Sequence, residues 1–367
     1  MGTLINKINF DRSYYYLLLA LAFVMPLSRA AISLFVVSLL ILWIIEGNWK
    51  KKLEFVNSSP VLKAMGIFIG YMTLTILWSS NTGQALDEIR MFGYWIIIPI
   101  IAMNIQRKNF NNVLTSFLLG MLVSEIISYG IYFEILSLEG VYSTNPTPFM
   151  NHIEYSVFLG LSAVILIYRI LLDEYTKKEK IFMFLFFLSI LGTLFITQGR
   201  MGQIAFLLSI IVMFVLHYKV TLKSIMLSFG FIFVLLTSFY EFSSNFKITY
   251  NKSMKDIEKI NNGQLTSSIG IRLSYWLLAY DILKENPFGV GIGDMDDDKV
   301  PYVDKMSTDY ELRVDFLKEN YFHNQFLQLL VAGGYLGLIL FMNILFQLCK
   351  SNIYKKEYKD IIFLFIA

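Results

Sequence analysis

Cysteine, histidine, proline and charged residues are all scarce in this chain. Its 367 residues include one cysteine, 3 histidines and 7 prolines. The single Cys349 excludes an intrachain disulfide and a cysteine-rich metal site. Charged residues make up 16% of the chain, against about 25% in an ordinary globular protein. The 31 basic and 28 acidic residues nearly cancel, so bulk electrostatic attraction to nucleic acid is not expected.

Hydrophobic residues are abundant instead, at 56% of the chain against about 45–50% in soluble proteins. This is more apolar surface than one compact core of this length buries, so part of the solvent is expected to be lipid. A helix needs about 20 apolar residues to span the hydrocarbon core of a bilayer. Eleven runs approach that length, at 13–27, 30–45, 61–78, 92–103, 113–136, 153–172, 181–197, 201–216, 222–240, 324–349 and, incompletely, 361–367. The first two runs are short for two crossings, and 92–103 is short with Pro99 inside it.

The basic residues predict the orientation of these helices, because short cytoplasmic loops collect Lys and Arg. With the N-terminus inside, inward segments carry 18 basic residues, while short outward turns carry only Arg29, Arg90 and Arg200. We therefore expect an all-α polytopic bundle with three parts. Residues 1–240 form about nine transmembrane helices, 241–322 form a large outer helical loop, and 323–367 form C-terminal transmembrane helices, the last one incomplete. Within the outer loop, 271–284 is predicted to be an amphipathic helix that ends at Asn286 and Pro287.

Arg200 lies in a short outward turn, in the sequence Gln198-Gly199-Arg200-Met201-Gly202 that opens an apolar helix. Arginine beside hydrocarbon is costly unless it reaches water, headgroups or an anion. The free amides at a helix start also favour negative charge, so both groups could act on one phosphate. The alternative is an interfacial arginine whose side chain reaches the headgroups for stability alone.

Arg272 opens the predicted outer helix, with Trp276 and Tyr280 on the same face at i+4 and i+8. A guanidinium beside aromatic rings could bind a phosphate with two hydrogen bonds while the rings stack on sugar. The alternative is a stabilising cation–π contact between Arg272 and Trp276.

His323 precedes the last complete apolar run, in His323-Asn324-Gln325-Phe326-Leu327. A helix N-terminus disfavours a charged imidazolium, so a neutral His323 could act as a general base. A structural histidine is the alternative. Asn324, beside it, and His152, which is also predicted to lie on the outer side, are further candidates for substrate contact.

Three other features are ambiguous. The glycine-rich segment 289–293 resembles a phosphate-binding loop but follows a helix, so a tight turn is favoured. The acidic run at Asp294, Asp296, Asp297 and Asp298 lacks the ligand pattern of a calcium loop, which leaves its role unassigned. Glu125 falls inside an apolar run, where an ionisable group is either functional or a neutral acid bonded within the bundle.

Taken together, these segments resemble the O-antigen ligase family of bacterial membrane proteins, which includes lipopolysaccharide O-antigen ligases and related O-antigen polymerases. The likeness covers roughly 113–349 and rests on three ordered blocks. They are Gln198 to Gly202, Arg272 to Gly293, and His323 to Leu330 running on to Gly337. The resemblance also implies further helices after the end of this sequence.

The resemblance implies transfer of a glycan from undecaprenyl diphosphate to an acceptor hydroxyl, without a metal or cofactor, at the periplasmic face of the inner membrane. Arg200 and Arg272 would bind the diphosphate, and His323 would activate the acceptor. The implied partners are the lipid-linked donor, a lipid A-core or other glycan acceptor, and membrane lipids, with no nucleic acid. An O-antigen ligase is the preferred interpretation.

Two alternatives stay open. An O-antigen polymerase differs only in its acceptor, which is another lipid-linked repeat unit. A polysaccharide-lipid transporter or flippase would instead depend on Glu125 and Arg169 within the bundle, whereas the polar candidates cluster at one face.

Overall fold

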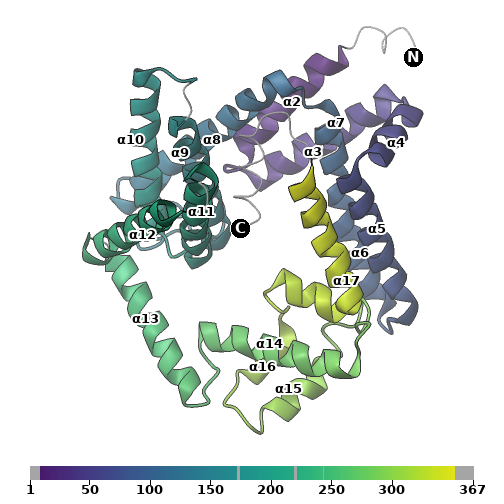
Figure 1. The fold of residues 1–367 in the computed structure, drawn as a ribbon. Coiled ribbons are helices and arrows are strands. Elements are labelled where there is room, and N and C mark those ends of the chain that lie inside the picture. The colour runs from purple at the N-terminus through teal and green to yellow at the C-terminus, as the bar shows by residue number, and fades with distance from the viewer. Residues whose placement is uncertain (1–8, 172–173, 219–220, 243, 352–367) are drawn as a thin grey trace. The chain divides into compact units, whose positions relative to one another are not determined.

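The computed structural model describes residues 9–171, 174–218, 221–242 and 244–351. Across these ranges the chain forms α-helices and short 3₁₀ turns, with isolated β-bridges and no β-strand (Figure 1). The prediction of an all-α chain is therefore confirmed. The helices pack into two units, each built from segments that are far apart in the sequence, and each unit is described separately below.

The first unit contains the described residues of 9–48 and 100–249. Its helices are α2 (Phe10–Val24), α3 (Arg29–Glu46), α8 (Phe110–Tyr132), α9 (His152–Leu171), α10 (Lys177–Ile196), α11 (Arg200–Tyr218) and α12 (Leu222–Phe242), with the 3₁₀ turn η3 (Arg107–Asn109) before α8. Helix α9 packs against both α10 and α11, and α2 packs against α8. Large apolar side chains such as Tyr155, Leu159, Ile190 and Phe195 are fully buried between these helices.

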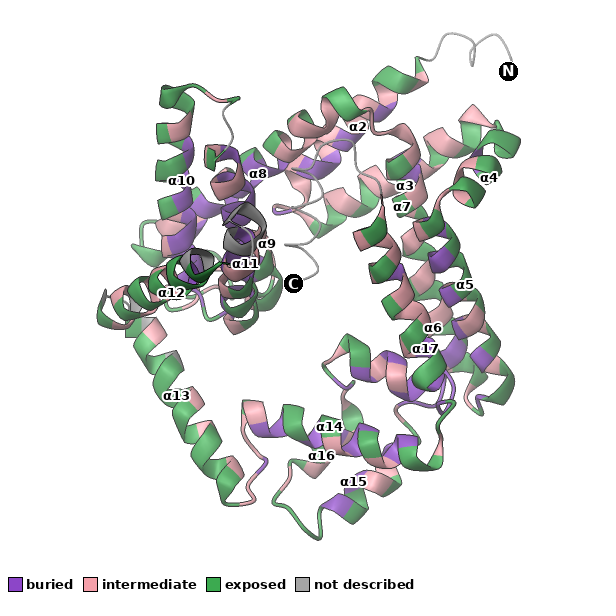
Figure 2. Ribbon diagram, in the orientation of Figure 1, coloured by how far each residue is buried: buried purple, intermediate pink, exposed green. Residues whose placement is uncertain are grey.

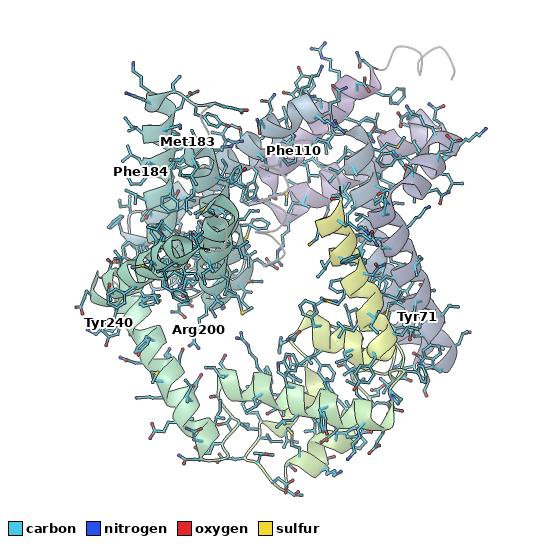
Figure 3. All side chains as sticks on the ribbon, viewed as in Figure 1. Tyr71, Phe110, Met183, Phe184, Arg200 and Tyr240 are labelled. Atoms are coloured by element: carbon cyan, nitrogen blue, oxygen red, sulfur yellow. The ribbon has the colours of Figure 1, made fainter. Side chains whose placement is uncertain are left out.

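The second unit contains residues 49–99 and 250–351. Its elements are α4 (Trp49–Ser58), α5 (Pro60–Leu74), η1 (Thr75–Trp78), α6 (Thr82–Phe92), η2 (Gly93–Ile96), α14 (Ser268–Glu285), α15 (Val300–Met306), α16 (Val314–Glu319) and α17 (Gln325–Lys350). Two further helices, α7 (Ile97–Asn104) and α13 (Ser244–Asn261), include residues of both units. Helix α17 packs against α5 and α14, and the Tyr71 hydroxyl of α5 donates a 2.8 Å hydrogen bond to the Gly333 carbonyl of α17 (Figure 3).

By length and composition, six helices of the described chain could cross a membrane. They are Arg29–Glu46, Pro60–Trp78, Arg107–Tyr132, His152–Leu171, Lys177–Ile196 and Gln325–Lys350, and Arg200–Met213 and Ile225–Ser238 are shorter apolar helices. The run predicted at 92–103 divides between η2 and α7, because Pro99 lacks an amide donor and fits only the first turn of a new helix. The run at 13–27 forms the 15-residue α2. The run at 361–367 lies outside the described residues.

The helix predicted at 271–284 is confirmed as α14, which begins three residues earlier than predicted, at Ser268, and ends at Glu285, directly before Asn286. Ser267 caps its start by accepting a 3.2 Å hydrogen bond from the Gly270 amide. Figure 2 shows buried and exposed residues alternating along α14. The buried side carries Tyr275 and Ile282, so α14 is fixed to the unit by one face and leaves the other open.

The glycine-rich segment after α14 inserts into a break in α17. The break lies at Gly334, whose backbone is non-helical with φ of 62°. Beside it, the Val290 amide donates a 2.9 Å hydrogen bond to the Val331 carbonyl. A Cβ atom at Gly289 would lie 2.4 Å from the Gly334 nitrogen, so only glycine allows this approach. The segment is therefore a tight structural turn and not a phosphate-binding loop.

The acidic run next to this turn joins the segment after α14 to the segment between η1 and α6. Both carboxylate oxygens of the buried Asp294 accept backbone hydrogen bonds, from Ser80 at 2.6 Å and Asn81 at 2.7 Å. Two residues on, Asp296 forms a 2.6 Å ion pair with Lys299, whose side chain is fully buried. Asp294 and Asp296 thus have a structural role, which the sequence left open.

Replacing Asp294 with alanine is expected to destabilise the protein by about 1.5–3 kcal/mol, because two backbone amides lose their buried, charged acceptor. Thermal unfolding in detergent measures the effect. The matched control is Asp297→Ala, since Asp297 is exposed and accepts one hydrogen bond, from the Asn81 side chain. Equal melting temperatures for the two variants would contradict the structural role of Asp294.

Candidate active site

His323 lies in the link between α16 and α17 and has a left-handed backbone, with φ of 49°. This conformation is uncommon outside glycine, although Asn, Asp and His tolerate it better than other residues. Its ring is held between two aromatic rings, with centroids 5.8 Å away at Phe316 and 5.9 Å away at Tyr275. The Tyr275 hydroxyl in turn donates to the Asn320 carbonyl at 3.2 Å. The imidazole is thus positioned by one ring from α14 and one from α16.

Asn324 caps the start of α17. Its side-chain oxygen accepts hydrogen bonds from the amides of Phe326 at 2.9 Å and Leu327 at 3.3 Å. The side chain therefore has a structural function as the N-cap, and its amide nitrogen is the part that could contact substrate. His323 directly precedes this cap, as the sequence predicted for the entrance of the helix.

A cavity of about 1010 Å³ within the second unit opens beside His323. Helices α5, α6 and α17 form most of its wall, together with η2 and the segment 292–295. The polar lining residues are Asp87, Glu88, Arg90, Tyr94, Trp95, Tyr321, His323, Asn324, Gln325 and Gln328, and the apolar ones include Met72, Phe92, Ile292, Met295, Leu329 and Phe341. The cavity wall thus combines polar side chains, His323 among them, with apolar side chains from α5, α6 and α17.

Helix α6 places three charged side chains, Asp87, Glu88 and Arg90, in the wall of this cavity. Burial, together with the negative charges of Asp296 and Asp87, raises the pKa of the Glu88 carboxyl. Arg90 makes no side-chain hydrogen bond, ion pair or cation–π contact with a described residue. The sequence did not single out these three residues, although Arg90 was one of the few basic residues in an outward turn.

The open face of α14 carries Arg272, Trp276 and Tyr280, all of them exposed. This arrangement confirms that the three residues share one face. Arg272 does not line the cavity. Its helix nevertheless contacts a residue of the cavity wall, because Tyr275 of α14 packs against the ring of His323. The guanidinium of Arg272 has no partner among the described residues, so the predicted alternative of a cation–π contact with Trp276 is not formed.

In the first unit, the start of α9 meets the start of α11. Gly199 lies so close to α9 that a Cβ atom there would be 2.5 Å from the His152 carbonyl, and the Ser156 hydroxyl accepts a 3.1 Å hydrogen bond from the Gly202 amide. Arg200 begins α11 and its guanidinium has no described partner (Figure 3). Two helix N-termini and a free guanidinium therefore lie in one place, which is a favourable environment for an anion.

The predicted site residues thus form one group in each unit. His323, Asn324 and the α14 residues belong to the second unit, and His152 and Arg200 belong to the first. That both groups act on one substrate stays a prediction.

Glu125 and Arg169, on which a transporter would depend, have structural partners inside the first unit. Glu125 is 1% exposed and accepts a 3.2 Å hydrogen bond from the Thr193 hydroxyl. Arg169 donates 3.0 Å hydrogen bonds to the Thr115 hydroxyl and the Asn111 carbonyl. These contacts tie α8 to α9 and α10, so they favour a role in packing for both residues.

In the described part of the chain, no group of three or more His, Cys, Asp or Glu side chains could hold a metal ion. Residues 182–342 match the family model described as O-antigen ligase. No curated protein matches the chain. The matched segment contains the blocks at Arg200, Arg272 and His323, so the family resemblance is confirmed over these residues.

Proposed function

We propose that this chain belongs to the O-antigen ligase family, and that it is a glycosyltransferase that moves a glycan from undecaprenyl diphosphate to an acceptor hydroxyl. The family match and the six apolar helices support a multi-pass membrane enzyme that uses lipid-linked glycans. The single observation that carries the proposal is that α14, whose Tyr275 contacts the ring of His323, also carries the unpartnered Arg272. This pair supplies a base and a cation, which are the two groups that the reaction needs.

In the proposed reaction, the acceptor oxygen attacks the anomeric carbon while the bond from that carbon to the diphosphate oxygen breaks. His323 removes the proton of the acceptor hydroxyl, a contribution of about 10²- to 10⁴-fold in rate. The diphosphate gains negative charge as it leaves. Arg272 and Arg200 would stabilise that charge through two-pronged hydrogen bonds, which only a guanidinium provides. The products are the glycosylated acceptor and undecaprenyl diphosphate.

The site is proposed to face the periplasm, in the inner membrane. The support is the distribution of basic residues, with 18 in inward segments against three in short outward turns. In this topology the outer loop, His323 and Arg272 all lie on the periplasmic side. Trp276 and Tyr280, exposed beside Arg272, would stack on the sugars of the donor.

The test is transfer by the purified protein in lipid, with purified lipid-linked donor and candidate acceptors, followed by mass spectrometry. We expect a glycosylated acceptor to form, with the same yield in the presence of EDTA because the two arginines replace a metal as charge stabilisers. Absence of product with every acceptor, from protein that binds the donor, would overturn the function. Loss of product with EDTA alone would overturn the metal-independent mechanism.

An O-antigen polymerase is the alternative, since the same residues would serve either acceptor. Loss of a ligase leaves finished polymer on its lipid carrier, whereas loss of a polymerase leaves at most single units on the lipid A-core. We prefer the ligase, and the glycan profile of a deletion strain separates the two.

A further inference from the structure

The polar part of the cavity beside His323 contains hydrogen-bonding groups of complementary kinds. Asp87 and Glu88 are acceptors when ionised, Arg90 is a donor only, and the amides of Gln325 and Gln328 are both. A sugar hydroxyl is itself both donor and acceptor, so it can use every one of these groups. A phosphate at neutral pH offers acceptors alone and would leave the carboxylates without a partner.

The charged side chains of the cavity also favour a neutral sugar over an anion. Two acidic side chains and one arginine line the cavity, so an anion would meet more repulsion than attraction there. In contrast, unpartnered Arg272 lies outside the cavity, on the open face of α14. The second unit thus separates a site suited to negative charge from one suited to neutral hydroxyl groups.

Aromatic side chains complete the cavity wall. Tyr94 and Tyr321 line it with exposed fractions of 61% and 51%, so their rings are open to a ligand. Trp95 also lines the cavity and is fixed by stacking on Phe68, with ring centroids 5.8 Å apart. Such rings present an apolar face with a polar edge, which matches the C–H and hydroxyl surfaces of a sugar ring.

We infer that this cavity binds the acceptor, and that it recognises a neutral, hydroxyl-rich terminal sugar through Glu88 and Arg90. The inference rests on the proposed function and extends it to the acceptor. His323 at the cavity wall then contacts the sugar that supplies the attacking hydroxyl. With a volume of about 1010 Å³, the cavity is as large as the largest of the small-ligand sites, which typically measure about 300–1,000 Å³, so it has room for more than one sugar ring.

The test compares the kinetics of Glu88→Gln and Arg90→Gln with those of the wild type. We expect the acceptor KM to rise about tenfold or more in each variant, because each loses a charged hydrogen bond to the sugar. The donor KM is expected to stay unchanged. The matched control is Glu319→Gln, since Glu319 is exposed on α16 and outside the cavity lining, and its acceptor KM should equal that of the wild type.

A second measurement uses acceptors that differ only in the charge of the terminal sugar. The wild type is expected to prefer a neutral hexose over the corresponding uronic acid, and Asp87→Asn combined with Glu88→Gln should reduce that preference, because the repulsion is gone. Arg90 is exposed and unpartnered, so the Arg90→Gln variant should fold normally. It therefore keeps the test valid even if Glu88→Gln, which changes a partly buried residue, fails to fold.

The outcomes separate the two proposals. The acceptor site would be overturned if the acceptor KM is unchanged in Arg90→Gln and in folded Glu88→Gln, or if the donor KM rises instead. Transfer by the wild type would still support the proposed function in that case. No transfer by the wild type would overturn the proposed function itself.

Discussion

Replacing His323 with asparagine is expected to lower the rate of glycan transfer about 10²- to 10⁴-fold, because the acceptor hydroxyl loses its general base. Asparagine is the informative substitution, since it tolerates the left-handed backbone that His323 adopts with φ of 49°. Alanine would remove the base and add backbone strain together. The rate at saturating donor and acceptor measures the effect, alongside donor binding, which should be retained.

Two controls make this result specific to the imidazole. The melting temperature of His323→Asn should stay close to that of the wild type, which separates chemistry from unfolding. Phe316→Leu removes one ring that contacts His323 but leaves the base in place, so it should cost far less activity. Full activity of a folded His323→Asn variant would eliminate the proposed mechanism.

Replacing Arg272 with alanine is expected to reduce the transfer rate about 10²- to 10³-fold, comparable to the loss of one donor that stabilises a developing negative charge. Arg272→Lys should also be impaired, because an ammonium group cannot reproduce the planar fork of a guanidinium. The same argument predicts impairment of Arg200→Lys. Transfer rates with lipid-linked donor measure all three variants.

Folding should not obscure this second result, since Arg272 is exposed and makes no side-chain contact with a described residue. Lys284→Ala is the matched control, because Lys284 is also exposed, carries the same charge and lies on the same helix. Its activity should equal that of the wild type. An Arg272→Lys variant as active as the wild type would show that the fork is not needed.

Local sequence signals predicted the helices that carry the site. Asn286 and Pro287 marked the end of α14, and the apolar run from 324 to 349 predicted α17 to within one residue at each end. Ser267, the cap of α14, was not among these signals, and the helix begins three residues before the predicted start. The periodicity of Arg272, Trp276 and Tyr280 also gave the exposed face of α14 correctly. These features follow from helix geometry and from capping, which depend on neighbours within a few residues.

Local sequence signals did not predict the structural role of the loop after α14. Its glycines resembled a phosphate loop, and its aspartates had no assigned role. Both belong to one docking arrangement, in which Gly289 approaches Gly334 and Asp294 binds the amides of Ser80 and Asn81. The partners are separated by more than 200 residues in the case of Asp294, so no local pattern reveals them.

The sequence alone therefore determined the all-α architecture, the order of the apolar helices, and the candidate arginines and histidine. It could do so because hydropathy, charge and helix period are local properties of the chain. Only the tertiary structure decided that α6 and α17 enclose a cavity with His323, Glu88 and Arg90 in its wall. Packing brings these residues together across more than 230 positions, and long-range packing depends on the complementarity of whole surfaces, which no single segment encodes.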